Sequence, residues 1–136
     1  MNRERAIQIT AFLLRVVAGL IFLQAGGVKL LDWFGGVPAG FGGHPKFPSQ
    51  IWIAGCLELV GGALILIGLL TRPVAFILSG EMAVAYFQFH QPRGTWPIQN
   101  HGEAAVLFCF IFLFFAAYGG GPWSIDALWR RRRAGA

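Results

Sequence analysis

Charged side chains are scarce in this chain of 136 residues, of which only 12% are Asp, Glu, Lys or Arg. Soluble domains carry about a quarter. Apolar residues make up 56%, with 13 Phe and 5 Trp, so little polar sequence remains to cover a surface that faces water. The composition excludes an ordinary soluble domain and predicts one membrane domain over residues 1–136.

Cysteine is almost absent, and the two cysteines present are isolated. Cys56 and Cys109 stand in apolar stretches and form no C-x-x-C pair, which disfavours a membrane thiol oxidase with a redox-active dithiol. We expect both to be packing residues. A phosphate loop, a G-x-S-x-G turn and an H-E-x-x-H pair are missing too, so the sequence predicts no intrinsic cofactor and no metal site.

Acidic residues are fewer than basic ones, which leaves a formal charge of +5. Four of the basic residues form the run 130–133, within a basic tail at residues 127–136 that we expect in the cytoplasm. No basic stripe with interleaved aromatic residues occurs elsewhere, so nucleic acid is not an expected partner. The run indicates contact with the membrane surface, and the lipid bilayer is the expected partner.

Four apolar stretches follow one another, and a helix that crosses hydrocarbon needs roughly 20 residues. Proline-containing turn segments separate them at residues 35–49 and 91–100, whereas Thr71-Arg72-Pro73 alone separates the second from the third. The sequence therefore predicts an all-α fold, a polytopic membrane protein built as a bundle of four transmembrane helices. The predicted helices cover about residues 7–31, 50–70, 71–90 and 100–120.

Basic residues flank the predicted helices unevenly. With the N-terminus inside, the cytoplasmic side carries most of them: Arg3, Arg5, Arg72 and the run 130–133. The positive-inside rule then places both termini in the cytoplasm. A secretory signal peptide is the competing interpretation of the first stretch, but Arg15 interrupts the apolar run and no A-x-A-like cleavage site follows. We expect an uncleaved first helix.

Ionisable side chains inside the predicted spans carry most of the functional information, because a buried charge must face a partner, a cation or water. In the first span Arg15, Gly19, Phe22, Gly26 and Lys29 recur every three or four residues and share one face. The two glycines allow another helix to approach closely. Snorkelling of the two basic side chains to opposite membrane surfaces is the alternative to burial.

Three carboxyl groups occur in the later spans. Glu58 and Glu81 lie at mid-depth, and Glu103 lies near the outer end of the fourth span. We expect a buried polar network in which Arg15 pairs with Glu58 or Glu81. Lys29 and Glu103 have a similar outer depth and form the second expected pair, which leaves one carboxyl without a basic partner. For Glu58, a purely structural clamp between helices is the alternative to a role in proton or ligand handling.

His90 and His101 flank the third predicted loop. Metal or haem ligation by this pair is weakly supported, because the sequence places no third ligand beside them. We interpret them as interfacial hydrogen-bonding groups or as proton-exchanging groups at a quinone headgroup. Lys29, His90 and Glu103 all lie near outer helix ends, where a quinone ring can rest with its tail in lipid, and they are the predicted ligand-binding residues.

Short motifs recur in a fixed order along nearly the whole chain: Leu14-Arg15, Gly19, Phe22, Gly26, Lys29-Leu30, Glu58, Gly61-Gly62, Leu70-Thr71-Arg72, His90, Asn100, Glu103 and the segment 120–126. This ordered set resembles the DoxX family of small four-helix membrane proteins. Glu81 departs from the family pattern, in which that stretch is usually apolar around its methionine.

The resemblance implies a bacterial or archaeal cytoplasmic-membrane protein linked to quinone-coupled oxidoreductase systems, including thiosulfate:quinone oxidoreduction. We therefore expect the membrane subunit of a quinone-linked oxidoreductase or redox-defence system, with quinone as the bound molecule and a soluble or membrane oxidoreductase partner that delivers electrons. Glu58, Glu103 and His90 are the candidate catalytic groups, since quinone reduction consumes protons. A small transporter or permeation pathway, a structural anchor or assembly factor, and association into a homo-oligomer stay open.

The predicted orientation leads to a labelling experiment. A cysteine introduced at Gly42 should react with an impermeant thiol reagent added outside the cell, whereas one introduced beyond Arg133 should not, because the Lys and Arg distribution places only the first outside. Labelling of intact and permeabilised cells measures both positions. The reverse pattern would contradict cytoplasmic termini.

Overall fold

The computed structural model describes residues 1–136 and consists of helices and connecting turns, with no strand. Its five longest helices are α1 (Arg3–Leu31), α2 (Gln50–Ile67), α3 (Thr71–Ala85), α5 (Glu103–Tyr118) and α6 (Ile125–Ala134). Short helical turns connect them: η1 (Trp33–Gly35), η2 (Ala39–Phe41), η3 (Tyr86–His90), η4 (Gln91–Arg93) and α4 (Pro97–Asn100). The all-α prediction is confirmed. By length and composition α1 and α2 qualify as membrane spans, while α5 is apolar but shorter.

Left-handed backbone positions explain where the helices end. Helix α2 stops at Ile67, three residues before the predicted end, because Gly68 adopts a φ of 72° that a helix does not allow. Helix α5 begins at Glu103, later than predicted, since His101 with φ 58° separates it from α4. Helix α3 continues directly into the wider turn η3, and the two together cover the predicted range 71–90.

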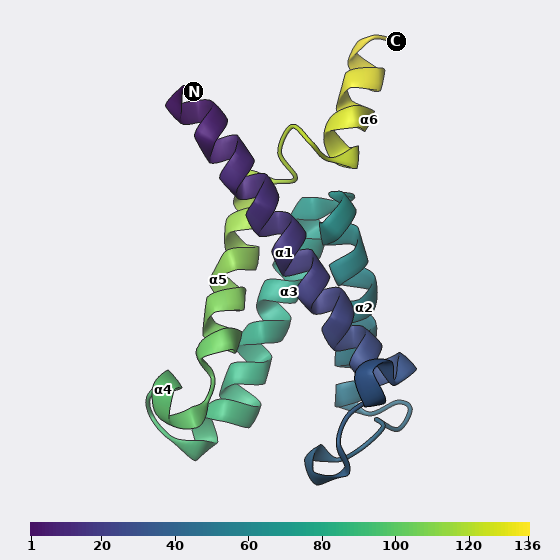
Figure 1. Cartoon of the computed structure of the whole chain (residues 1–136), viewed down its shortest axis with the longest axis vertical. Coiled ribbons are helices and arrows are strands. Elements are labelled where there is room, and N and C mark those ends of the chain that lie inside the picture. Colours follow the sequence, from purple (N-terminus) through teal and green to yellow (C-terminus); the bar gives the residue numbers. More distant parts are fainter.

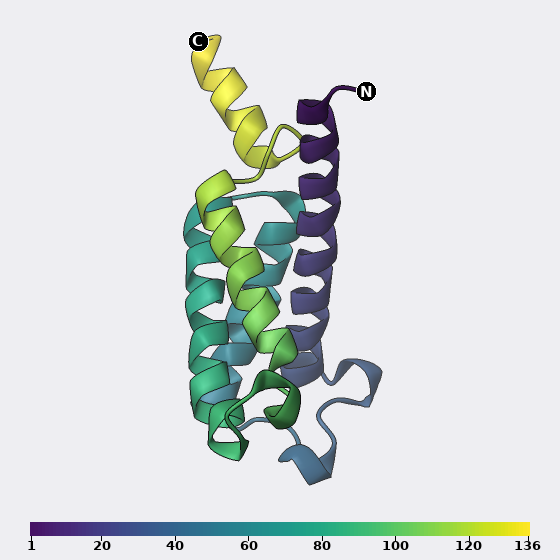
Figure 2. The same ribbon diagram turned by 90° about the vertical axis from the view of Figure 1, so that its left-hand side faces the viewer.

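The four central helices form two pairs. Helix α1 packs along α2, and α3 packs along α5, as two perpendicular views show (Figure 1, Figure 2). The pairs meet near the end of the molecule that carries both chain termini and diverge towards the opposite end (Figure 1). Helix α6, with its exposed arginines at 130–133, projects beyond the converging end.

Glycine residues bring α1 and α2 into backbone contact. Gly19 and Gly26 of α1 face α2, and Gly62 of α2 faces α1. A Cβ atom at Gly19 would lie 2.6 Å from the backbone nitrogen of Leu66, closer than non-bonded atoms approach. A side chain there would have to push the helices apart. The prediction that the glycines of the first span allow a close approach is therefore confirmed.

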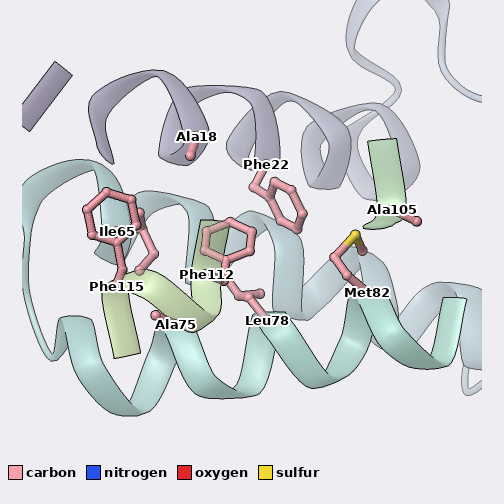
Figure 3. Close-up of a cluster of buried hydrophobic side chains, with 9 residues drawn as sticks. All are labelled: Ala18, Phe22, Ile65, Ala75, Leu78, Met82, Ala105, Phe112 and Phe115. Carbon is pink, nitrogen blue, oxygen red and sulfur yellow. The ribbon is translucent and has the colours of Figure 1, made fainter. Parts of the chain in front are cut away.

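A buried apolar cluster joins the two pairs. Figure 3 shows its members: Ala18, Phe22, Ile65, Ala75, Leu78, Met82, Ala105, Phe112 and Phe115. Phe22 of α1 meets Phe112 of α5 edge to face, with ring centroids 4.6 Å apart. Such an aromatic pair stabilises a fold by about 1 kcal/mol beyond the burial of its area. The cluster holds the two pairs together, and its members Met82 and Ala105 reach the cavity between them.

Arg15 fastens the converging end and does not pair with an acid. Its guanidinium is 1% exposed and donates to the carbonyls of Ile65 and Leu66, each at 2.7 Å, and to that of Trp123 at 2.6 Å. The last carbonyls of a helix lack intrahelical partners and attract a cation. The predicted pairing of Arg15 with Glu58 or Glu81 is wrong. Arg15 binds the C-terminal end of α2, and Glu58 lies about two helical turns before that end.

Asp126 completes this fastening from the C-terminal segment. Its carboxylate accepts hydrogen bonds from the backbone N–H groups of Leu70 at 2.8 Å and Thr71 at 2.9 Å, at the start of α3. Its own N–H donates to the carbonyl of Gly68 at 3.0 Å. Negative charge at a helix N-terminus is stabilising. The segment 120–126, recognised in the sequence only as a motif, thus ties α6 to the turn between α2 and α3.

Candidate functional site

A cavity of about 620 Å³ lies between the helix pairs towards their diverging end. Of its 19 lining residues 14 are hydrophobic, so most of its wall suits hydrocarbon. The volume falls within the range of small-molecule sites. Exposed side chains of α2 and α3, among them Ile53, Ile77 and Val84, form part of the lining. The cavity therefore reaches an apolar surface that would face lipid in a bilayer.

Four ionisable side chains interrupt this apolar wall, and each comes from a different helical element. Lys29 belongs to α1, Glu58 to α2, Glu81 to α3 and His90 to η3. Residues that are 61 positions apart in the chain, from Lys29 to His90, thus line one space. A few convergent polar groups in an otherwise apolar cavity are typical of ligand sites.

Lys29 and Glu58 form an ion pair on the cavity wall. The ammonium group of Lys29 donates to Oε2 of Glu58, and the two side chains are 25% and 7% exposed. Because α1 packs along α2, the end of α1 brings Lys29 beside Glu58 of α2 rather than beside α5. The predicted pairing of Lys29 with Glu103 is wrong for this reason. Glu103 is exposed at the start of α5 and does not line the cavity.

Glu81 lines the same cavity without a protein partner. Both of its carboxyl oxygens are buried and receive no hydrogen bond. Buried polar atoms are nearly always hydrogen-bonded, and an unsatisfied one costs about 1 to 3 kcal/mol. Glu81 does not join Arg15, which lies at the other end of the bundle. The expected network of three residues is thus replaced by Glu58 and Glu81 on one cavity wall, with Arg15 separate.

His90 is held in place through Asn100. Its Nδ1 lies 3.1 Å from the backbone carbonyl oxygen of Asn100, a residue that is 0% exposed. The Asn100 side chain donates to the carbonyl of Gly94 at 2.9 Å and accepts from the N–H of Gly102 at 2.9 Å. These bonds fix the loop that follows η3. Asn100 appeared in the sequence as part of a motif, and its role as the support of His90 became visible only in the fold.

The other outer histidine lies apart from the cavity. His101 is exposed, ends α4, and is not among the lining residues. The structure holds no group of three or more His, Cys, Asp or Glu side chains placed to bind a metal ion. His90 and His101 therefore do not form a shared site with a third ligand.

The arrangement combines an apolar space with groups that donate, accept and exchange protons. Lys29 offers N–H donors, Glu58 and Glu81 offer carboxyl oxygens, and His90 offers an imidazole. Such a site suits a molecule with a flat polar head and an apolar body. Two of the predicted ligand-binding residues, Lys29 and His90, meet here, and Glu103 does not. Glu58 and Glu81 were predicted for a separate network with Arg15, and their place beside Lys29 and His90 became visible only in the fold.

Comparisons with known proteins identify relatives that share most of this chain, including the part that forms the cavity. The DoxX family model matches residues 10–91, which include all four ionisable residues of the cavity. An uncharacterized protein of Haemophilus influenzae is 40% identical over 118 residues, covering 83% of this chain and 85% of its own. An uncharacterized membrane protein of Mycobacterium tuberculosis is 30% identical over 127 residues, covering 83% and 77%. No solved structure matches the chain.

The ion pair generates a stability prediction. Lys29→Met should lower the free energy of unfolding by about 2 kcal/mol, because it leaves the Glu58 carboxyl buried without its partner. The loss stays below the roughly 3 to 5 kcal/mol of a fully buried pair, since Lys29 is 25% exposed. Lys29→Met combined with Glu58→Met should recover most of the loss. Unfolding in mixed detergent micelles measures all three variants, and a double variant less stable than Lys29→Met would contradict the pairing.

Proposed function

Because the chain belongs to the DoxX family of membrane proteins, we propose that it is the membrane subunit of a quinone-linked oxidoreductase or redox-defence system and that its cavity takes the quinone headgroup. The prediction of the family from the ordered motifs is confirmed. The observation that carries the proposal is the apolar cavity with Lys29, Glu58, Glu81 and His90 on its wall.

The chemistry of a quinone matches the two properties of this cavity. A quinone ring with its isoprenoid tail is apolar, so it gains from burial against the hydrophobic lining. Its two oxygen atoms need hydrogen-bond partners, and their reduction or reoxidation moves protons. Lys29, Glu81 and His90 are groups able to hold the headgroup and to exchange those protons. Electrons would come from an oxidoreductase partner.

The helices also have dimensions that support a bundle of four membrane spans. Helices α1 and α2 qualify by length and composition. Helix α3 with η3 runs from Thr71 to His90, which at 1.5 Å rise covers about 30 Å, the thickness of a hydrocarbon core. Helix α5 is shorter and would be completed by its flanking turns. We place the bundle in the cytoplasmic membrane of a bacterium or archaeon, with the cavity in the outer half and both termini inside.

This proposal predicts that filling the cavity blocks binding. Ala54 lines the cavity from α2, so Ala54→Phe should reduce the affinity of purified protein for a decyl-substituted quinone at least about tenfold, by occupying the space of the ring. Titration calorimetry in detergent measures the affinity.

Ala117→Phe provides the matched control, because Ala117 is exposed on α5 and does not line the cavity. That variant should bind like the parent protein. Equal affinity of Ala54→Phe and the parent, with both proteins folded, would remove the cavity as the quinone site.

A further inference from the structure

The wall of the cavity presents hydrogen-bond acceptors that the protein itself leaves without a donor. The ammonium group of Lys29 donates one hydrogen bond, to Glu58. Glu81 presents two buried carboxyl oxygens that receive no hydrogen bond from the protein. Even a protonated carboxyl keeps acceptor capacity. Within the protein, no group donates a hydrogen bond to Glu81.

His90 adds a second acceptor. Its Nδ1 lies 3.1 Å from the carbonyl oxygen of Asn100, and because a carbonyl can only accept, Nδ1 must carry the hydrogen. In the neutral ring the other nitrogen, Nε2, then bears a lone pair. No hydrogen bond of the protein involves Nε2. The support from Asn100, which is itself completely buried, thus selects the tautomer that leaves an acceptor for a ligand.

We infer that the cavity selects the reduced, dihydroxy form of its headgroup, a hydroquinone, over the oxidised quinone, with Glu81 and His90 accepting hydrogen bonds from the hydroxyl groups. The inference rests on the proposed function, in which the cavity takes a quinone-type headgroup. A hydroquinone offers two O–H donors, whereas a quinone offers only acceptor oxygens. Glu81 is then the residue that sets this preference.

The apolar, lipid-facing part of the cavity lining also matches the alkyl tail of a hydroquinone. A hydroquinone with an alkyl tail carries its donors at one end and hydrocarbon at the other. The cavity likewise has its acceptors on a wall that is otherwise mostly hydrophobic, with exposed apolar side chains of α2 and α3 in its lining. A neutral phenolic donor also leaves the Lys29–Glu58 pair intact.

The test compares the two redox forms of one ligand, of which only the reduced form carries O–H donors. Binding of a decyl-substituted hydroquinone and of the matching quinone to the full-length purified protein is measured without oxygen, by titration calorimetry. The parent should bind the hydroquinone about tenfold more tightly, the size expected from one or two additional hydrogen bonds. The dimethyl ether of the hydroquinone, which keeps the oxygens but lacks both O–H groups, should bind as weakly as the quinone.

Substitutions then test which residues cause the preference for hydroquinone over quinone. Glu81→Met, which keeps the length of the side chain and removes both oxygens, should bring the two affinities within about twofold. Glu103→Gln is the control, since Glu103 does not line the cavity, and it should retain the full preference. Thermal unfolding accompanies each titration, and Glu81→Met should be no less stable than the parent because it removes no hydrogen bond. His90→Phe should also reduce the preference and provides an independent variant.

The outcomes separate this inference from the proposed function. Equal binding of both redox forms, tighter binding of the quinone, or an unchanged preference in both Glu81→Met and His90→Phe would overturn the selection of hydroquinone while leaving the quinone site in place. Absence of binding of either form to the folded parent would overturn the proposed function itself. Tighter binding of decylammonium than of the hydroquinone would assign Glu81 to a cation and would also overturn the inference.

Discussion

The guanidinium of Arg15 is the interaction on which the arrangement of the helices depends. It occupies the carbonyl end of α2 and reaches Trp123 in the C-terminal segment, so three parts of the chain meet at one charge. In a hydrocarbon environment such a charge is retained only if its donors find acceptors, and the free end of a helix supplies them. Asp126 does the same with a negative charge: its carboxylate accepts hydrogen bonds from the backbone N–H groups at the start of α3, next to the end of α2.

This fastening at one end gives the two helix pairs room to diverge at the other. Backbone contact at Gly19 and Gly62 keeps α1 on α2, while Phe22 of α1 packs against aromatic rings of α5. The apolar cavity lies towards the opposite end, where the two pairs are further apart. Its polar groups are unequal: Lys29 and Glu58 satisfy each other, and Glu81 is left with a free energy cost that a bound molecule with O–H groups would remove.

The helical class and the glycine contact could be predicted from the chain, because helical spacing shows which side chains share a face. Lys29 and His90 could be assigned to the site from their position near helix ends, whereas Glu58 and Glu81 were expected elsewhere. The pairing of charges could not be predicted. Depth alone favoured Glu103 as the partner of Lys29, and only the packing of α1 on α2 brings Lys29 to Glu58. Likewise, Arg15 was assigned to an acid because carbonyl groups at helix ends carry no sequence signature.

The central claim is that the space between the helix pairs holds a quinone-type headgroup in the membrane. The most direct measurement is mass spectrometry of the lipids extracted from protein purified in mild detergent, with the quinone content expressed per chain. We expect close to one quinone or hydroquinone per chain, retained through size-exclusion chromatography. A quinone content no higher than that of an unrelated membrane protein purified from the same cells would contradict the claim.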